Sequence, residues 1–525
     1  MEEQSLKVKN ILFFVVLALI LGTIPYLIAW GLTDNAHQFF GAIVNVDDFK
    51  AYLSAIQQGR QGYWLFHYNF TPEQYEPQLM YPLYILIGKL AGILGGKNIV
   101  WLHISRLAFG LFTFLAFRFW VQSMFPKSKS LQLSAWLLIS FGSGFGLFIV
   151  LINWDPVNLP LDLIVPELNT ITNLISSPHY ILAVGLLAVY FGSLQLFATE
   201  ESSSKWALIA TFAGLGIGLI YPYQIPMIGL TTGLWLITIA LRQKRIPWKK
   251  WAQGAVVLAP LTIMLVYYAL VARQDALWEL TFVANHGRPS PSPWKLFLAF
   301  GFLAVFAAAS IFRQVRVLKS STFLLPIIWA AVNLFVLYLP FPFALRLVLG
   351  LHIPIGSLAA IFVEETILPG LKKFNISRGV ILFATVPTTL LFVSFVSTIA
   401  AGENNYPYYY LESEITAVDW LAAQLEEDDL ILANYHLGGY IPTVMNAKVF
   451  MGQFAITIDY RDKIALAQKF WEADTPQSWR EDFVKEWGIT HIIQAAAEAS
   501  DSGERIVLPY EVIFQQNGVT IYSIE

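Results

Sequence analysis

Residues 11–30 read ILFFVVLALILGTIPYLIAW, an apolar run of the length that crosses a bilayer, for which about 20 residues suffice. The run follows Lys7 and Lys9 and has no small-residue cleavage site after it, so it is not typical of a signal peptide. We expect an uncleaved first transmembrane helix. The run decides the fold, because similar runs recur along the rest of the chain.

The composition supports a membrane protein. The chain has 525 residues, of which 56% are hydrophobic and only 13% are charged. Soluble domains carry about 25% charged residues, so this balance indicates an integral membrane protein. A net charge of −3 gives no reason to expect a nucleic-acid partner. The absence of cysteine excludes disulfides, thiol nucleophiles and cysteine-bound zinc.

Apolar runs predict eleven crossings. The candidate spans are residues 11–30, 99–122, 131–152, 178–198, 206–221, 223–241, 251–272, 294–312, 322–339, 343–363 and 379–399. Basic residues gather between them in PKSKS (126–130), RQKRIPWKK (242–250), RQVRVLK (313–319) and LKKFNISR (371–378). The positive-inside rule places these segments and the N-terminus in the cytoplasm, most simply at the plasma (inner) membrane. This requires that residues 81–96, which are short, glycine-rich and carry Lys89, are interfacial or re-entrant; a twelfth crossing stays open.

The C-terminal segment has a different composition and predicts a small α/β domain outside the cytoplasm. We place the membrane domain at 1–402, with an external loop at 31–80, and the soluble domain at 403–525. A helix is expected from a capping Ser413, and a hairpin turn at Asn517–Gly518. Strands are expected in DLILANY (429–435), KVFMGQF (448–454) and ITHIIQ (489–494). The segment contains no Walker or G-x-G-x-x-G pattern, and Gly438–Gly439 alone does not indicate a nucleotide site.

Two adjacent aspartates in the first external loop are the candidate catalytic residues. The stretch VNVDDFKAYLSAIQQG (Val44–Gly59) predicts a helix that begins near Asp47 and Asp48. One interpretation is that an aspartate only caps this helix. The other is that one carboxylate faces a cavity, as general base for an acceptor hydroxyl or as ligand of a divalent cation such as Mg²⁺ or Mn²⁺. Asp48 is the candidate metal ligand.

Further ionisable residues fall on the same predicted side. The loop after the third span contains Asp162 and Glu167, and His179 follows it. Arg346 lies near the external end of a late span, and His352 lies six residues further on. Ionisable groups inside a membrane are costly and are candidates for function, and a guanidinium there suits a phosphate anion. The remaining candidate for substrate binding is Tyr221, at an external corner between two helices.

These features together resemble the GT-C superfamily of membrane glycosyltransferases. A first span is followed by an acidic pair on a short external helix, and YPLY (81–84) is similar to a "YPPLY"-type segment of that superfamily. A late arginine and an external C-terminal domain are also similar. The resemblance is to enzymes of the protein mannosyltransferase and aminoarabinose transferase type. A WWD-type motif of oligosaccharyltransferases is absent from the tail, which argues against N-glycosylation.

The resemblance implies an enzyme of the cell envelope. It would transfer a hexose or pentose, with inversion, from a polyprenyl phosphate to a glycan, lipid or protein acceptor. Asp47 or Asp48 would match the general base or metal-binding acid, and Arg346 the contact to the donor phosphate. Glu167 and His179 match less closely, because the second acidic motif varies within the superfamily. A secondary transporter and a non-catalytic assembly protein of envelope biogenesis are the alternatives.

Overall fold

The computed structural model describes residues 8–153, 155, 158–199, 203–274, 289–315, 323–371, 379, 384–402, 406–425, 429–495 and 506–524. The predicted basic segments at 313–319 and 371–378 and the predicted loop 273–293 lie wholly or partly outside these residues. Contacts divide the chain into two compact units. The first contains Met1–Ile24, Ser105–Gln274 and Asn285–Val396, and the second contains Pro25–Ile104, Asp275–Ala284 and Ser397–Glu525.

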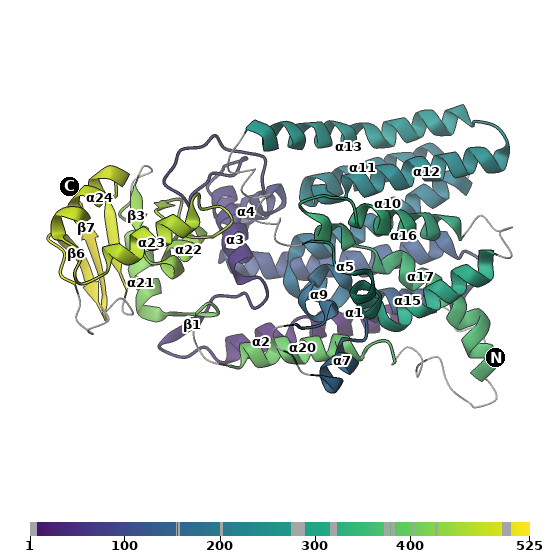
Figure 1. Ribbon diagram of the computed structural model, residues 1–525, viewed down its shortest axis with the longest axis horizontal. Helices are drawn as coiled ribbons and strands as arrows, with labels where there is room; N and C mark the ends of the chain where they lie inside the picture. Colours follow the sequence, from purple (N-terminus) through teal and green to yellow (C-terminus); the bar gives the residue numbers. More distant parts are fainter. Residues whose placement is uncertain are drawn as a thin grey trace. The chain divides into compact units, whose positions relative to one another are not determined.

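Helices are the regular secondary structure of the described residues of the first unit. Its helices are α1 (Val8–Leu21), α5 (Asn98–Met124, from Ser105 on), α6 (Lys129–Phe141), α7 (Gly146–Ile152), α8 (Leu161–Ile164), α9 (Thr170–Ser176), α10 (Pro178–Thr199), α11 (Ser203–Ile220), α12 (Ile225–Gln243), α13 (Trp248–Gln274), α15 (Pro293–Val315), α16 (Leu324–Leu337), α17 (His352–Phe362), α18 (Leu368–Leu371) and most of α20 (Pro387–Ala400). Shorter 3-10 turns lie at Pro166–Leu168, Pro222–Gln224 and Ala344–Val348. Helices α10, α11 and α13 pack against one another in turn (Figure 1).

Each of the eleven predicted spans contains helix. Within the described residues, seven of these spans are long and apolar enough to cross a membrane, and α6 with α7 would make an eighth, bent by 49°. The predicted spans at 206–221, 322–339 and 379–399 contain the shorter apolar helices α11, α16 and α20. Residues 81–96 form α4 (Pro82–Leu94), whose 13 residues at about 1.5 Å each are too short for about 30 Å of hydrocarbon. The protein is therefore a polytopic helical membrane protein, and the number of crossings stays a prediction.

Glycines allow a close approach where α6 breaks. Gly301, inside α15, has a φ of 50°, and a Cβ on it would lie 2.9 Å from the backbone of Gly144. A Cβ on Gly144 would lie 2.2 Å from the Ala299 carbonyl oxygen. A side chain at either position would force these backbones apart, so the break between α6 and α7 depends on both glycines.

The second unit combines the segment that follows the first predicted span with the C-terminal segment. Its helices are α2 (Ile24–Gly31, from Pro25 on), α3 (Val46–Arg60), α4, α21 (Glu412–Leu421), α22 (Tyr435–Val444), α23 (Tyr460–Phe470) and α24 (Gln477–Trp487). Strand β1 (His37–Phe39) of the loop pairs antiparallel with β2 (Tyr409–Leu411) of the tail. Lys463 on α23 binds Glu73 of the loop at 2.6 Å. The predicted division at residue 402 stays a prediction, and the contacts group residues on both sides of it.

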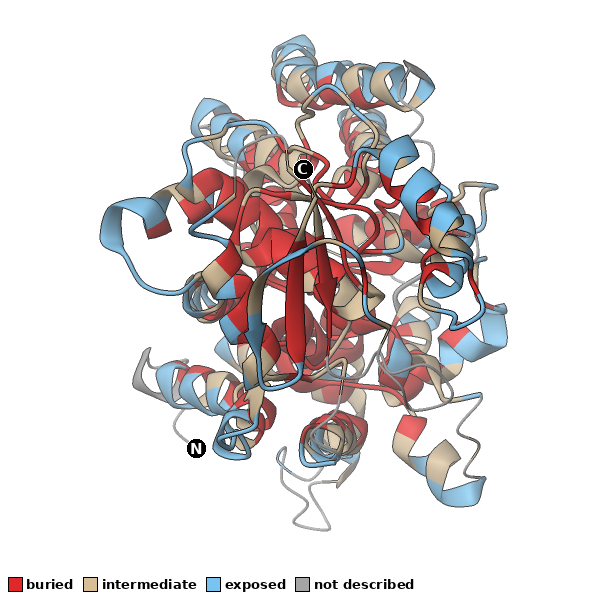
Figure 2. Ribbon diagram, turned by 90° about the vertical axis from the view of Figure 1, so that its left-hand side faces the viewer, coloured by how far each residue is buried: buried red, intermediate tan, exposed pale blue. Residues whose placement is uncertain are grey.

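A five-stranded sheet forms the core of the tail. Its strands are β3 (Leu430–Leu432), β4 (Lys448–Val449), β5 (His491–Gln494), β6 (Glu511–Gln516) and β7 (Val519–Ser523), in the order β4-β3-β5-β7-β6. Strand β3 is parallel to β4 and β5, whereas β7 is antiparallel to β5 and β6. The inner strands are buried (red in Figure 2), and β6 forms an exposed edge. The predicted strands and α/β character are confirmed.

The turns of the tail agree with its sequence, with one exception. Asn517 and Gly518 have φ values of 45° and 84°. A two-residue hairpin turn with the sequence Asn-Gly requires positive φ at both residues. The predicted cap at Ser413 is wrong, because α21 begins one residue earlier, at Glu412, and its N-cap Leu411 makes no side-chain hydrogen bond. Since β2 ends at Leu411, the pairing of β2 with β1 sets the start of this helix.

Candidate active site: two charged clusters

The first cluster begins at the N-terminus of α3. The helix starts at Val46, after Asn45 in the left-handed conformation with a φ of 53° and no side-chain cap. The interpretation that an aspartate caps this helix is therefore wrong. Asp47 and Asp48 instead occupy the first turn, where carboxylates interact favourably with the helix dipole. Both are half-buried, and consecutive side chains on a helix point about 100° apart.

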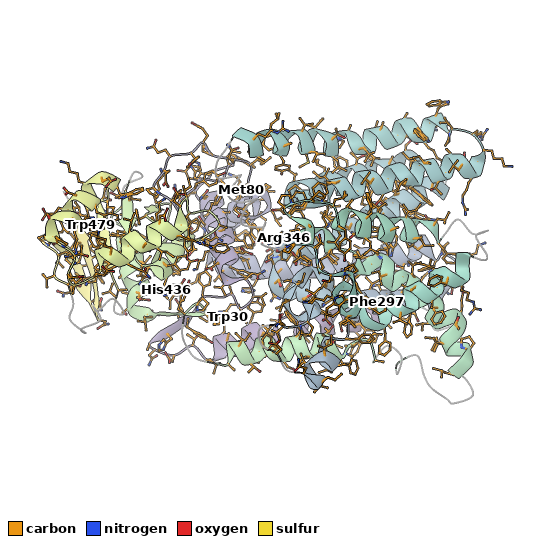
Figure 3. All side chains as sticks on the ribbon, viewed as in Figure 1. Trp30, Met80, Phe297, Arg346, His436 and Trp479 are labelled. Atoms are coloured by element: carbon orange, nitrogen blue, oxygen red, sulfur yellow. The ribbon has the colours of Figure 1, made fainter. Side chains whose placement is uncertain are left out.

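Lys50 binds Asp47 one turn further along α3. Its ammonium nitrogen lies 2.7 Å from Asp47 Oδ1; the Lys50 side chain has no exposure, whereas that of Asp47 is 35% exposed. The same nitrogen donates to the Tyr406 hydroxyl at 2.8 Å. It also lies over the rings of Tyr406 and Tyr435, 5.0 and 4.7 Å from their centroids. His436 of α22, labelled in Figure 3, contacts the Tyr406 ring in an edge-on arrangement.

The position of Lys50 depends on a glycine of the tail. A Cβ on Gly439 would lie 2.7 Å from Lys50 Cδ, so the aliphatic stem of the lysine crosses α22 where that helix has no side chain. The neighbouring Gly438 faces the backbone of Met451, with 2.0 Å between its would-be Cβ and that carbonyl oxygen. The Gly438–Gly439 pair therefore serves close packing.

Burial controls the protonation of this cluster. It lowers the pKa of Lys50, and the Asp47 carboxylate opposes that shift. Burial and then the charge of Lys50 lower the pKa of His436 to about 4, so this imidazole is neutral at neutral pH. Burial and then Asp47 raise the pKa of both Tyr406 and Tyr435, so their hydroxyls keep their protons. His436, Tyr406 and Tyr435 are therefore neutral groups around the pair of Lys50 and Asp47.

The second cluster surrounds Arg346 (Figure 3), in the 3-10 turn before α17. Its guanidinium Nη1 donates to Glu167 Oε1 at 2.7 Å and also to the Tyr180 hydroxyl. The side chains of Arg346 and Glu167 are 14% and 2% exposed. Tyr221 donates to the backbone oxygen of Arg346 at 3.3 Å, and His179 packs between Tyr180 and Tyr221. Four predicted residues, Arg346, Glu167, His179 and Tyr221, thus meet in one place.

Two other predicted residues make separate contacts that hold helices. Asp162 Oδ2 accepts from the backbone N–H of Gly146 at 3.0 Å, at the start of α7. Burial raises the pKa of Asp162 to about 7. His352 Nε2 lies 3.1 Å from Thr170 Oγ1, and the His352 ring packs on Phe117. Asp162 and His352 thus act at helix termini, apart from the hydrogen bonds of Arg346.

The described side chains near Asp47 do not supply a full set of three protein ligands for a divalent cation. Within the described ranges, no three histidine, aspartate or glutamate side chains lie together in a way that could hold a metal ion. The cation nearest to Asp47 is the ammonium of Lys50. We therefore assign no step to a metal ion at this site.

Sequence reasoning missed the residues that surround Asp47. Lys50 had a readable signal, since it lies three residues after Asp47 on a predicted helix, on the same face. The sequence contains no such signal for the partners from the tail, because they lie more than 350 positions further along the chain; these are Tyr406, Tyr435 and His436. Tyr180, a partner of Arg346, was visible only as the neighbour of His179.

The fold is that of the GT-C membrane glycosyltransferases, as the resemblance implied. No family model and no curated protein sequence matches the chain. Among solved structures, ArnT from Cupriavidus metallidurans bound to undecaprenyl phosphate is similar, with a TM-score of 0.54, 12% identity and 98% of both chains covered. The oligosaccharyltransferase of Archaeoglobus fulgidus in complex with Zn and sulfate has a TM-score of 0.56 at 13% identity, over 92% of this chain and 68% of its own.

A third relative in fold is much longer. The arabinofuranosyltransferase AftD from Mycobacteria has a TM-score of 0.53 at 13% identity. The match covers 100% of this chain and 42% of the AftD chain. A further structure of the archaeal enzyme, AglB, is in complex with an inhibitory peptide and a dolichol-phosphate. At these identities the likeness is one of fold.

Proposed function

We propose that this protein is an integral membrane glycosyltransferase that moves a sugar from a polyprenyl-phosphate-linked donor to an acceptor outside the cytoplasm. The observation that carries the proposal is the ordered guanidinium of Arg346, 14% exposed in an apolar span and held by Glu167. The GT-C fold supports it, since solved structures of that fold are complexes with undecaprenyl phosphate and dolichol-phosphate.

In this proposal the two clusters have different roles. The Asp47 carboxylate accepts the proton of the acceptor hydroxyl, and the resulting oxygen nucleophile attacks the anomeric carbon of the donor sugar. The bond between that carbon and the phosphate oxygen breaks, with inversion, and polyprenyl phosphate leaves as an anion. Arg346 stabilises the charge that develops on the leaving phosphate. Glu167 orients the guanidinium, and His179 and Tyr221 form the wall around it.

Of the remaining sequence predictions, the proposal keeps some, leaves out the metal ion and gives two residues a structural role. The N-terminus is cytoplasmic and the tail extracytoplasmic at the plasma membrane, on the basis of the basic segments. A Mg²⁺ or Mn²⁺ requirement is left out, because the described donors around Asp47 do not form a metal site. Asp48 is kept as a second acid near the acceptor. Asp162 and His352 are assigned to holding helix termini, on the basis of their bonds to Gly146 and Thr170.

The test measures release of polyprenyl phosphate. The purified protein is incubated with a panel of polyprenyl-phosphate hexoses and pentoses and with glycan, lipid and peptide acceptors, and free polyprenyl phosphate is quantified by mass spectrometry. Asp47→Asn should lower the rate by about 10²–10⁴-fold, the usual contribution of a general base. Arg346→Gln should lower it by about 10²–10³-fold, as for one lost electrostatic contact in the transition state.

Matched variants separate chemistry from folding. Arg313→Gln removes an exposed arginine at the end of α15 and should keep the wild-type rate. If Asp47→Asn and Arg346→Gln have the same thermal unfolding curves as the wild type, their loss of activity is a loss of chemistry and not of folding. Absence of release from every donor and acceptor in the panel, by well-folded protein, would contradict the proposed function. Equal release by wild type and Asp47→Asn would remove Asp47 from the mechanism.

A further inference from the structure

We propose that Lys50 is the fixed cation of the Asp47 site and takes the place that the sequence suggested for a divalent metal ion. The inference rests on the proposed function, because it assigns a positioning role in that reaction. The sequence offered a divalent cation as one of two roles for the acidic pair, the other being that of general base. The contacts of the described residues place an ammonium there instead.

The burial of Lys50 calls for a specific reason. Its side chain has no exposure to solvent, and an unpaired ammonium in such a place is strongly unfavourable. Its partners are one carboxylate oxygen of Asp47 at 2.7 Å, one tyrosine hydroxyl at 2.8 Å and the faces of two tyrosine rings. The Asp47 carboxylate favours the charged form of Lys50 and opposes the burial that lowers the pKa of this lysine, so the pair depends on both side chains.

A second buried lysine in the same unit shows what a purely structural pair looks like. Lys463 is 2% exposed and binds both oxygens of Glu73, at 2.6 and 2.7 Å, and also Thr71 Oγ1 at 2.9 Å. Both oxygens of Glu73 are therefore engaged by one ammonium. Lys50 holds Asp47 through Oδ1 alone, and 35% of the Asp47 side chain is exposed. The two carboxylate side chains are similarly exposed, 35% for Asp47 and 29% for Glu73, so the difference between the pairs is that Lys50 contacts one carboxylate oxygen and Lys463 contacts two.

The ammonium accounts for what a metal ion would contribute at this carboxylate. It holds Asp47 Oδ1 at 2.7 Å and so fixes the orientation of this half-buried side chain. A divalent cation bound to Asp47 would sit close to the ammonium, and two cations in a site of reduced dielectric repel one another. In the reaction the acceptor proton passes to Asp47, and Lys50 stays protonated and forms no covalent bond.

The tail has a defined part in this arrangement. Tyr406 and Tyr435, together with the bare helix face at Gly439, hold Lys50 in place. The C-terminal segment therefore completes the support of a residue in the first loop. We expect Tyr406→Phe to weaken the reaction less than removal of the ammonium, since it removes one of several partners.

The first experiment tests whether the reaction requires a metal ion and whether it requires the charge of Lys50. Wild-type release of polyprenyl phosphate should stay within about twofold when EDTA replaces Mg²⁺. Lys50→Met, which keeps the length but removes the charge, should lower kcat by about 10²-fold or more with little change in donor KM; Lys50→Arg should recover part of it. Lys463→Met is the matched control, with a lower melting temperature and wild-type kcat at a temperature where it is folded.

A rescue experiment separates charge from packing. Ethylammonium added to Lys50→Ala should restore activity at least tenfold, whereas neutral ethanol at the same concentration should not. Rescue by both compounds or by neither would indicate that Lys50 acts only through packing. Loss of wild-type activity in EDTA with recovery in Mg²⁺ would overturn the inference, and so would full activity of Lys50→Met.

A binding measurement decides the inference without activity. Mn²⁺ is titrated into wild type and Asp47→Asn and followed by electron paramagnetic resonance, and both should bind the same amount. A Mn²⁺ site present in wild type and lost in Asp47→Asn would overturn the role of Lys50 even if no sugar donor were known. If no donor reacts while the Mn²⁺ titrations agree, the proposed reaction fails and the assignment of Lys50 as the cation beside Asp47 stands.

Discussion

Asp162 illustrates how much the surroundings of one residue change its meaning. As one of several ionisable residues in a loop, it was a candidate for substrate binding. In the structure its side chain is 1% exposed, and it accepts a hydrogen bond from the backbone at the start of α7. A Cβ on Gly146 would lie 2.7 Å from Asp162 Oδ1, so the carboxyl fills the space next to that glycine. Asp162 therefore stabilises the chain where α6 ends and α7 begins.

Asp162→Asn should therefore change the pH dependence of stability. Burial raises the pKa of Asp162 from 3.8 to about 7 in the folded protein. The folded state thus binds the proton of Asp162 more tightly than the unfolded state does. The resulting contribution to the free energy of unfolding is complete below pH 3.8 and is lost as the pH rises to about 7. Melting temperatures from the fluorescence of the 17 tryptophans, measured from about pH 4 to 8, should fall more steeply with pH in wild type than in Asp162→Asn. Parallel curves would show that Asp162 is ionised throughout.

At the scale of elements, the packing of α22 on its neighbours is set by two adjacent glycines with different surroundings. Gly438 meets the backbone of Met451, and Gly439 meets the flexible side chain of Lys50. The Met451 backbone cannot move without disturbing β4, which ends two residues before it, whereas a lysine stem can shift by changing rotamer. The same substitution at neighbouring positions should therefore have different effects.

Gly438→Ala should mainly lower stability, and Gly439→Ala should mainly lower activity. The first places a methyl group 2.0 Å from a carbonyl oxygen, which we expect to cost about 1–3 kcal/mol of unfolding free energy, as overpacking does. The second displaces Lys50 from Asp47. Melting temperature and polyprenyl phosphate release would be measured for both. Gly229→Ala on α12, where nothing lies within 4 Å of the new methyl group, is the control and should be neutral in both assays. The reverse pattern for the two variants would contradict this account.

At the scale of the whole molecule, the second unit is assembled from segments about 370 residues apart. Strand β1 of the first loop pairs with β2 of the tail, and His37 lies opposite Leu411. The neighbouring residues Ala36 and Glu412 share a backbone hydrogen bond, so His37 and Leu411 form a non-hydrogen-bonded pair. In such pairs the Cα atoms are about 4.5 Å apart, which is within the range that a disulfide can bridge.

A His37→Cys, Leu411→Cys double variant should form a disulfide under mild oxidation. The wild-type chain has no cysteine, so any crosslink would come from the engineered pair. Mass spectrometry of a non-reduced digest would detect the joined peptides. A control pair shifted by one residue, Gln38→Cys with Leu411→Cys, places the thiols on opposite faces of the two strands and should not crosslink. Crosslinking of the control alone would show that the register is different.

The sequence predicted the membrane helices and the strands of the tail because their signals are local. Apolar runs of about 20 residues, alternating strands and the Asn517–Gly518 turn can each be read within a short window. The capping residues expected for the helices near Asp47 and Ser413 were wrong, because the N-caps are Asn45 and Leu411. For α21 the reason is a distant partner, since the pairing of β1 with β2 fixes where that helix begins.

By itself the sequence determined a polytopic helical membrane protein with an acidic pair after its first span, a late arginine and a small α/β tail, since hydrophobicity and turn chemistry act over short distances. Only the tertiary structure decided which charges meet. Arg346 and Glu167 are 179 residues apart, and Lys50 and Tyr406 are 356 apart. Such pairs form because a buried charge must find a partner, and that partner comes from whichever segment the fold brings within about 3 Å. The cation beside Asp47 is an example, because only the folded chain shows that Lys50 supplies it.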